Sequence, residues 1–259
     1  MTTIAHLSDF HFGTDLPRIA DALVSDVIAQ HPDLVAFSGD ATQRALAPQY
    51  KAVQAYLGRF PTPWISVPGN HDIPLYNPIA RALHPLAAYR EHIATDIEPS
   101  HFDDRLAVVS ISTARHYLWK DGTVSTSQIR RMQREFRKAA PTACRVVMMH
   151  HPCLVPPEFP VHNTVRNAKA ALAAFSRAKV DVVLTGHMHD AFVVRVEPGP
   201  RRPHPVVLSQ AGTAISSRRR SQPNSYNIVT ITDQTVIVTI RMWGGNAFAD
   251  AGAYSFERE

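Results

Sequence analysis

The sequence predicts an α/β fold, in which short buried strands alternate with amphipathic helices. Two observations support this prediction. Continuous apolar runs, without the alternation of a half-exposed strand, recur between segments whose apolar residues have helical spacing, as expected for a largely parallel sheet. Each run ends in a polar turn that carries Asp, His or Asn. Ligands of open α/β sheets collect beyond the carboxyl ends of the strands, so these turns are the expected place for a functional site.

The N-terminal part of the chain repeats a pattern of strand, polar turn and helix. Thr3–Leu7 is the first expected strand, and Pro17 suits the first turn of the following helix, where the N–H that proline lacks has no partner. The strands Leu34–Phe37 and Trp64–Val67 follow, with a second helix around Tyr50–Leu57 between them. Such units are typical of parallel strand pairing.

The middle of the chain is less regular but continues the alternation. Ile73–Pro78 is expected to be a proline-containing loop, followed by one helix over Ile79–Tyr89. The further expected elements are strand Leu106–Ile111, helix Ser127–Ala139, strand Arg145–Met149, a helix through Val165–Phe175 and strand Val180–Thr185.

Beyond residue 190 the pattern changes to apolar runs that are typical of successive antiparallel strands. These runs are Phe192–Val196, Val206–Gln210, Tyr226–Ile231 and Val236–Ile240. No linker, repeat or low-complexity block divides the chain, so we expect a single domain over 1–259. We divide it into a motif-bearing core at 1–190, a β-rich completion at 191–242 and a Gly- and Ala-rich tail at 243–259 that we assign to no element.

Composition and charge narrow the classes of function. No apolar run approaches the ~20 residues of a membrane helix, and the N-terminus lacks the basic and apolar regions of a signal peptide, so we expect a cytoplasmic protein without a transmembrane segment. Cys144 and Cys153 cannot form a disulfide framework and are expected to be free thiols. The net charge of +5 and the pI near 9.4 fit an anionic substrate, nucleic acid or an anionic surface, but also ordinary charge variation.

The polar turns after the strands carry residues that suit metal ions. In an extended segment the side chains at i and i+2 leave on the same side, so His187 and His189 are expected to face one site, as are Asp9 and His11. Imidazole and carboxylate groups suit zinc, iron and manganese, and the absence of cysteine among them argues against a structural zinc site. The turns are Asp9-Phe10-His11, Gly39-Asp40, Gly69-Asn70-His71-Asp72, His150-His151-Pro152 and Gly186-His187-Met188-His189.

With these turns in this order, Ile4 to His189 resembles the calcineurin-like metallophosphoesterase superfamily, and within it the bacterial class III cyclic-nucleotide and glycerophosphodiester phosphodiesterases. The resemblance implies a four-layer αββα sandwich, in which two mixed β-sheets are flanked by helices. It also implies two bound metal ions, which would be Mn, Fe or Zn. By this resemblance, Asp9, His11 and His189 hold the first metal, Asn70, His150 and His187 hold the second, and Asp40 bridges the two.

The implied reaction is hydrolysis of a small phosphodiester by a hydroxide that bridges the metals, with a 3′,5′-cyclic nucleotide as the first candidate substrate. His71 is expected to protonate the leaving oxygen or to stabilise the transition state, with Asp72 as its orienting partner. Alternatively, His71 is a structural histidine beside the ligand Asn70. His151 is expected to contact the substrate or a metal ligand. The loops 73–78 and 153–165 are expected to border the pocket.

Other functions remain open at this point. Nuclease activity would suit the pI and the arginines at 201–202 and 218–220, although such short clusters are usually solvated and no appended DNA-binding segment is visible. A phosphomonoesterase, or a pyrophosphatase acting on nucleotide-linked lipids, would use the same centre. A non-catalytic scaffold is disfavoured because every ligand position is filled. The sequence indicates no oligomeric state.

Overall fold

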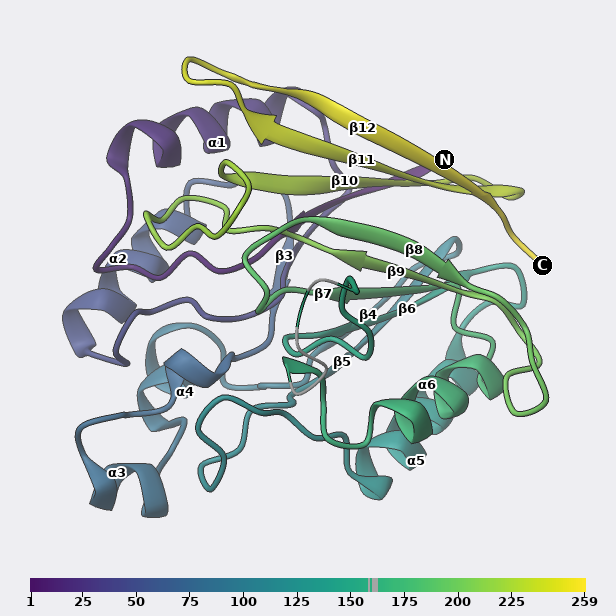
Figure 1. The fold of residues 1–259 in the computed structure, drawn as a ribbon, viewed down its shortest axis with the longest axis horizontal. Helices are drawn as coiled ribbons and strands as arrows, with labels where there is room; N and C mark the ends of the chain where they lie inside the picture. The colour runs from purple at the N-terminus through teal and green to yellow at the C-terminus, as the bar shows by residue number, and fades with distance from the viewer. Residues whose placement is uncertain (158, 160–162) are drawn as a thin grey trace.

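The computed structural model describes residues 1–157, 159 and 163–259, and its strands form two six-stranded sheets (Figure 1). The strands are β1 (Thr2–Leu7), β2 (Leu34–Phe37), β3 (Trp64–Ser66), β4 (Ser100–Phe102), β5 (Leu106–Ile111), β6 (Cys144–Met149), β7 (Val182–Thr185), β8 (Phe192–Val196), β9 (Val206–Gln210), β10 (Ser225–Ile231), β11 (Thr235–Trp243) and β12 (Phe248–Glu257). The α-helices are α1 (Pro17–Ala29), α2 (Ala47–Leu57), α3 (Pro78–Leu83), α4 (Ala87–His92), α5 (Thr126–Glu135) and α6 (Ala168–Arg177), with 3₁₀ turns at Asn70–Asp72 and Phe136–Lys138.

Both sheets are mixed. The first has the strand order β12-β11-β10-β1-β2-β3, with parallel pairing from β1 to β3 and antiparallel pairing from β1 to β12. The second has the order β4-β5-β6-β7-β9-β8, with parallel pairing from β5 to β9 and an antiparallel strand at each edge. The parallel strands have apolar residues on both faces because each sheet is covered on both sides.

The layers follow from which residues pack together. Alternate residues of β1 point to opposite faces of the first sheet: Ile4 packs against the second sheet, whereas Leu7 packs against α1 and α2. The second sheet likewise places Val146 between the sheets and Val147 against α5 and α6. The order of layers is therefore helix, sheet, sheet, helix, which confirms the expected αββα sandwich (Figure 1).

The expected helix over Ile79–Tyr89 is wrong as a single element, because α3 and α4 divide it. Pro85 lies between the two helices, and the backbone at His84 has the non-helical angles φ −139° and ψ 53°. Proline disfavours the helical conformation in the residue before it, so α3 ends there. The apolar spacing alone therefore predicted one long helix where the chain forms two short ones.

The C-terminal strands divide between the sheets instead of forming one antiparallel series. β8 and β9 complete the second sheet, whereas β10 and β11 extend the first. The tail at 243–259, which the sequence left unassigned, contains β12 on the edge of the first sheet. Most residues of β12 are exposed, so its sequence carries little apolar alternation to recognise. In the described part of the chain, no helix is both long and apolar enough to cross a membrane.

Backbone hydrogen bonds join the turns that follow β1, β2, β6 and β7. The amide of Asp9 donates to the carbonyl of Gly39 at 3.0 Å, and the amide of Gly186 donates to the carbonyl of His150 at 3.0 Å. Between the sheets, the amide of His187 after β7 donates to the Oδ2 of Asp9 after β1 at 3.0 Å. The two sheets therefore meet at these turns, whose polar side chains lie at one end of the sandwich.

Candidate metal centre

The turns at the strand ends hold their residues in an unusual backbone conformation. Asp9, His11, Asp40, His187 and His189 have φ values of 55°, 46°, 55°, 73° and 66°. The left-handed region is unfavourable for residues with a Cβ atom, by roughly 1–2 kcal/mol each. Backbone strain of this kind concentrates at functional sites.

Two glycines allow the turns to approach each other. Gly39 has a φ of +96°, which favours glycine. At Gly186 a Cβ atom would lie 1.8 Å from the Oγ of Ser8 and 2.5 Å from the Oδ2 of Asp9. A side chain at position 186 would therefore push the turn after β7 away from the turn after β1.

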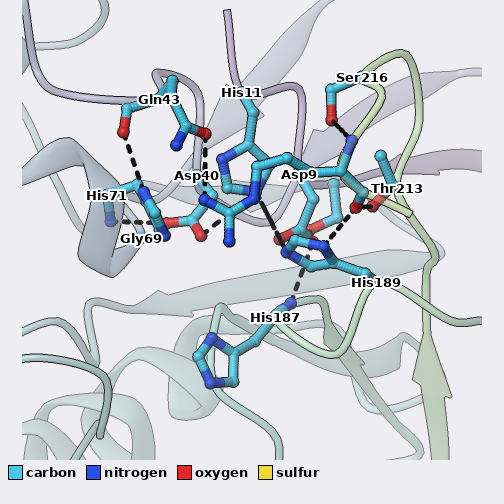
Figure 2. Close-up of polar contacts among 12 residues, drawn as sticks. Asp9, His11, Asp40, Gln43, Gly69, His71, His187, His189, Thr213 and Ser216 are labelled. Carbon is cyan, nitrogen blue, oxygen red and sulfur yellow. Dashed lines mark hydrogen bonds and ion pairs between the residues drawn. The ribbon is translucent and has the colours of Figure 1, made fainter. Parts of the chain in front are cut away.

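The first candidate group consists of Asp9, His11, Asp40 and His189, whose potential ligand atoms all lie within 4.8 Å of one another. The Nε2 atoms of His11 and His189 are 3.2 Å apart. The Oδ1 of Asp9 lies 3.6 Å from the first of these atoms and 3.3 Å from the second. All four residues are buried, and their side chains converge in Figure 2.

The second candidate group consists of His150, His151 and His187, again with ligand atoms within 4.8 Å. Asp40 lies between the groups, because its Oδ2 is 3.7 Å from the Nε2 of His11 and 3.3 Å from the Nε2 of His150. A carboxylate in this position can contact two cations at once.

His187 and His189 do not face one point as an extended segment would place them. His189 points toward Asp9, whereas the ring of His187 points away from it and lies 5.2 Å from the ring of His150 (Figure 2). The left-handed backbone at both histidines abolishes the alternation expected of a strand. The two imidazoles therefore belong to different groups.

Backbone carbonyls orient two of the rings. The Nδ1 of His150 donates to the carbonyl of Ser38 at 2.7 Å, and the Nδ1 of His189 donates to the carbonyl of Arg218 at 2.5 Å. A carbonyl only accepts, so Nδ1 carries a proton in both rings and Nε2 is the ring atom that faces the cluster. This arrangement is typical of metal-binding histidines.

Burial and charge set the titration of the cluster. Burial alone would raise the pKa of Asp9, but the adjacent imidazoles of His11 and His189 hold it well below its usual range. Burial lowers the pKa of His11 to about 4 and that of His187 to about 3, so both rings are neutral and can bind a cation. Burial also lowers the pKa of His150, but the neighbouring Asp40 carboxylate outweighs it and raises that pKa to about 9.

His71 lies at the edge of the buried cluster. Its backbone N–H donates to the Oδ1 of Asp40 at 2.9 Å, and its ring lies 4.8 Å from the ring of His11. The Nδ1 of His71 donates to the backbone carbonyl of Gln43 at 3.0 Å (Figure 2). The carbonyl thus orients the ring, and Nε2 remains for chemistry.

Asp72 has different partners from those expected. Its buried carboxylate accepts from the amides of Ala41, Thr42 and Gly69, at 3.1, 2.9 and 2.9 Å. Burial raises the pKa of Asp72 to about 6, and the negative charge of Asp40 adds to the effect. Asp72 therefore joins the turns after β2 and β3, while Gln43 takes the place expected for it beside the ring of His71.

Arg218 links the two sides of the site, and the sequence identified it only as one of several clustered arginines. Its backbone carbonyl accepts from His189, and its Nη1 donates to the Oε1 of Gln43 at 3.2 Å. Arg218 also lines two adjoining cavities, of about 320 and 230 Å³, both of which reach Asn70, His71 and Lys120.

The expected rim loops are found at these cavities. Ile73 and Leu75 line the larger cavity, and Asn163 lines the smaller. Residues 158 and 160–162 of the second loop lie outside the described residues. Arg219 and Arg220 line the smaller cavity, whereas the arginines at 201–202 line a separate one with Lys169 and Arg177.

The cluster contains buried polar atoms without hydrogen-bond partners, which suit metal ions. Asp9 Oδ1, Asn70 Oδ1 and His150 Nε2 are buried without a hydrogen-bond partner among the described residues. A buried polar atom left without a partner costs about 1–3 kcal/mol. Cations at this place would satisfy these atoms together, with loss of the proton that the raised pKa keeps on His150. The oxygen and nitrogen donors suit manganese, iron or zinc.

His151, which the sequence predicts to contact the substrate or a metal ligand, lies in the second group beside His187. Its Nδ1 lies 2.8 Å from the Oγ1 of Thr113, and its ring lies 4.5 Å from the ring of His187. The Nε2 of His151 is buried without a hydrogen-bond partner in the described chain. Its adjacency to His150 in the sequence was the available signal.

One protein family matches this chain. The sequence model described as calcineurin-like phosphoesterase covers residues 2–191, which include all of the turns described above. No curated protein has significant sequence similarity to the chain.

Solved structures with the same fold have low sequence identity. A purple acid phosphatase from yellow lupin (Lupinus luteus) has a TM-score of 0.71 at 11% identity; the match covers 100% of this chain, which spans about half of the lupin protein (54%). A dimetal phosphatase from Danio rerio has a TM-score of 0.69 at 12% identity, with 100% and 99% covered. GAP50 of Plasmodium, an anchor in the inner membrane complex, has a TM-score of 0.67 at 14% identity, with 100% and 89% covered. At such identities the likeness concerns the fold.

Proposed function

The chain belongs to the calcineurin-like phosphoesterase family, and from this premise we propose that it hydrolyses a small phosphodiester, with a 3′,5′-cyclic nucleotide as the first candidate. The observation that carries the proposal is the position of Asp40 between two groups of buried, unpaired ligand atoms, beside cavities large enough for a small molecule. A dimetal phosphatase with the same fold supports the same class of chemistry.

In this proposal the residues hold two cations. Asp9, His11 and His189 would hold one, Asn70, His150 and His187 would hold the other, and Asp40 lies near enough to both groups to contribute to each. When bound, two such cations supply positive charge to the phosphoryl oxygens and lower the pKa of a bound water, with Mn, Fe or Zn as the candidates. The carbonyls of Ser38 and Arg218 keep the rings of His150 and His189 in the required orientation.

His71 is the proposed general acid. Its Nδ1 is engaged by the carbonyl of Gln43, so Nε2 is the atom that can give a proton to the leaving oxygen. His71 lines both cavities, and this position between them suits a group that acts at the bond being broken. Asp72 supports this step indirectly, because it fixes the turns that carry Asp40 and His71.

The pair of cavities supports a diester over a monoester. Both cavities reach Asn70 and His71, so a phosphate held there has a cavity on either side. A diester has two organic groups and can use both cavities, whereas a monoester has one. Lys120 and Arg218, which line both cavities, supply positive charge next to the phosphate.

The decisive experiment compares bis(p-nitrophenyl) phosphate with p-nitrophenyl phosphate in Mn²⁺, with a chelated control. Chelator-sensitive preference for the diester is expected, followed by turnover of a cyclic nucleotide in a substrate screen. Preference for the monoester contradicts the diester proposal. Inactivity on both by protein that contains no metal favours a scaffold role, as in the anchor GAP50.

Nuclease activity is the second candidate, because Arg218, Arg219 and Arg220 lie at the site and not on a remote surface. A polynucleotide contacts several cations, so its hydrolysis falls steeply with salt. Activity on single-stranded DNA that drops by orders of magnitude between 50 and 200 mM salt, together with inactivity on cyclic nucleotides, would favour this candidate.

A further inference from the structure

The larger cavity beside His71 has room for more than a phosphate group. It has a volume of about 320 Å³ and extends from Asn70 and His71 to Ile73, Leu75 and Trp119. Binding sites for small molecules begin at about this size. The wall also contains charged side chains, among them Arg44, Arg81 and Lys120. The part of the cavity next to Trp119 is therefore available to an organic group of the substrate.

Arg81 holds Trp119 at this wall. The Nε and Nη2 of Arg81 donate to the carbonyls of His116 and Leu118 at 2.7 Å each, and its Nη1 donates to the carbonyl of Pro74 at 3.2 Å. The guanidinium carbon lies 4.7 Å from the ring centroid of Trp119. Three carbonyl partners fix the guanidinium, so it gives the indole a rigid support.

The indole itself is 64% exposed although it is supported in this way. A cation on one face of an aromatic ring leaves the opposite face for a second planar group. Stacking of a nucleobase on an aromatic side chain contributes binding energy, and every base can stack because every base has a π-face. Trp119 is therefore both supported by Arg81 and exposed, as stacking on a planar group requires.

We propose that Trp119 is a specificity-determining residue, which stacks on a planar aromatic ring, such as a nucleobase, in an ester group of the substrate. The inference rests on the proposed function, because it assumes that the phosphate lies at His71. Trp119 lines the larger cavity and, among the described residues, is absent from the wall of the smaller one. The aromatic group therefore occupies the larger cavity, while Lys120 and Arg218 contact the phosphate between the two.

The test measures binding, so that it does not depend on turnover. The ligands are the 5′-methylenephosphonate analogues of adenosine 5′-monophosphate and of ribose 5-phosphate, which differ in the base and resist hydrolysis because carbon replaces the ester oxygen. Calorimetric titration of the Mn²⁺-loaded protein is expected to give about fivefold to a hundredfold tighter binding of the adenosine analogue. Trp119→Leu removes this preference and leaves the affinity for the ribose analogue unchanged, whereas Trp119→Phe retains most of it.

Tyr117→Leu is the matched control, because Tyr117 is an aromatic residue of the same loop with the same exposed fraction of 64%. This variant keeps the full preference for the adenosine analogue. Equal affinity of the wild-type protein for both analogues overturns the proposal, and so does a preference that persists in Trp119→Leu. If the preference is found but no phosphodiester is hydrolysed, the stacking role stands and the proposed reaction fails.

Discussion

The floor and the rim of the site are built in different ways. The floor consists of Asp9, His11, Asp40, His150 and His189. The rim consists of His71, Trp119, Lys120 and Arg218. Floor residues come from turns after strands of both sheets and are at most 7% exposed, whereas Trp119 in the rim is 64% exposed. Backbone in the left-handed region occurs at four of the five floor residues, whereas the rim is held by hydrogen bonds and a cation–π contact between loops.

The comparison separates two kinds of residue. A change in the floor alters whether the proposed centre can form, because its side chains are buried and some of their polar atoms have no hydrogen-bond partner among the described residues. A change in the rim leaves the centre intact and alters proton transfer, affinity or selectivity. Effects on activity should therefore fall in size from the floor outward.

Asp40→Asn is expected to have the largest effect. The exchange preserves the shape of the side chain and an acceptor for the N–H of His71, but it removes the negative charge between His11 and His150. The kcat for bis(p-nitrophenyl) phosphate should fall more than about a hundredfold, since even residues that only support metal ligands contribute 10–100-fold. Metal content, measured by mass spectrometry of the purified variant, should fall with it.

Chelation of the wild-type protein is the matched control for this variant. Activity lost to a chelator should return on addition of Mn²⁺, whereas Asp40→Asn should stay inactive in the same buffer. Turnover of the variant near the wild-type rate would contradict the proposed role of Asp40 between the two cations.

His71→Asn is expected to have the next largest effect, and one that depends on the leaving group. Without a proton donor at Nε2, hydrolysis of an alkyl diester should slow by about 10²–10⁴, and that of a nitrophenyl diester by much less, because nitrophenolate leaves without a proton. The floor is unchanged, so metal content should match the wild type. An equal loss with both leaving groups would support a structural role for this histidine.

The floor could be predicted from sequence because the same turns show both the residue types that suit metal ions and the strand ends where a site is expected. Each of its residues lies in a polar turn directly after an apolar run, and strand ends meet at one edge of a sheet. The layers of the fold follow from the same apolar runs. β12 was missed for the opposite reason, since an exposed edge strand needs no apolar pattern.

The rim and the ring orientations could not be predicted in this way. The groups that orient His71, His150 and His189 are backbone carbonyls, which every residue type supplies. Ser38 and His150 are also 112 residues apart, so no local spacing indicates the contact. The arginines at 201–202 and 218–220 look alike in the sequence, and the tertiary fold alone brings one cluster to the site.

Arg218→Gln tests the rim directly and should have a moderate effect. It removes a guanidinium that lines both cavities but keeps the backbone carbonyl that accepts from His189. A hydrogen bond to a charged group contributes about 1.5–3 kcal/mol, so KM for a small diester should rise about 10–100-fold with little change in kcat. Steady-state kinetics measure both parameters.

Arg202→Gln is the control, since Arg202 lines a separate cavity with Lys169 and Arg177. Its kinetics on a small diester should equal those of the wild type. A rise in KM for single-stranded DNA in this variant, with the small diester unaffected, would instead support the nuclease candidate.

Asp190→Asn should have the smallest effect on activity, because it acts on the rim through the loop that carries Arg218. The buried carboxylate accepts from the amides of Ser221 and Gln222 at Oδ1 and from the Ser221 hydroxyl at Oδ2, and an amide side chain keeps an acceptor at only one of these two positions. Urea unfolding should show a loss of about 1–3 kcal/mol, while KM rises only severalfold and kcat is retained. Asp233→Asn, at an exposed aspartate in the turn between β10 and β11, should change neither. Lower stability with an unchanged KM would mean that Arg218 keeps its position without this anchor, and that the rim depends less on its loop than on the bond between Arg218 and Gln43.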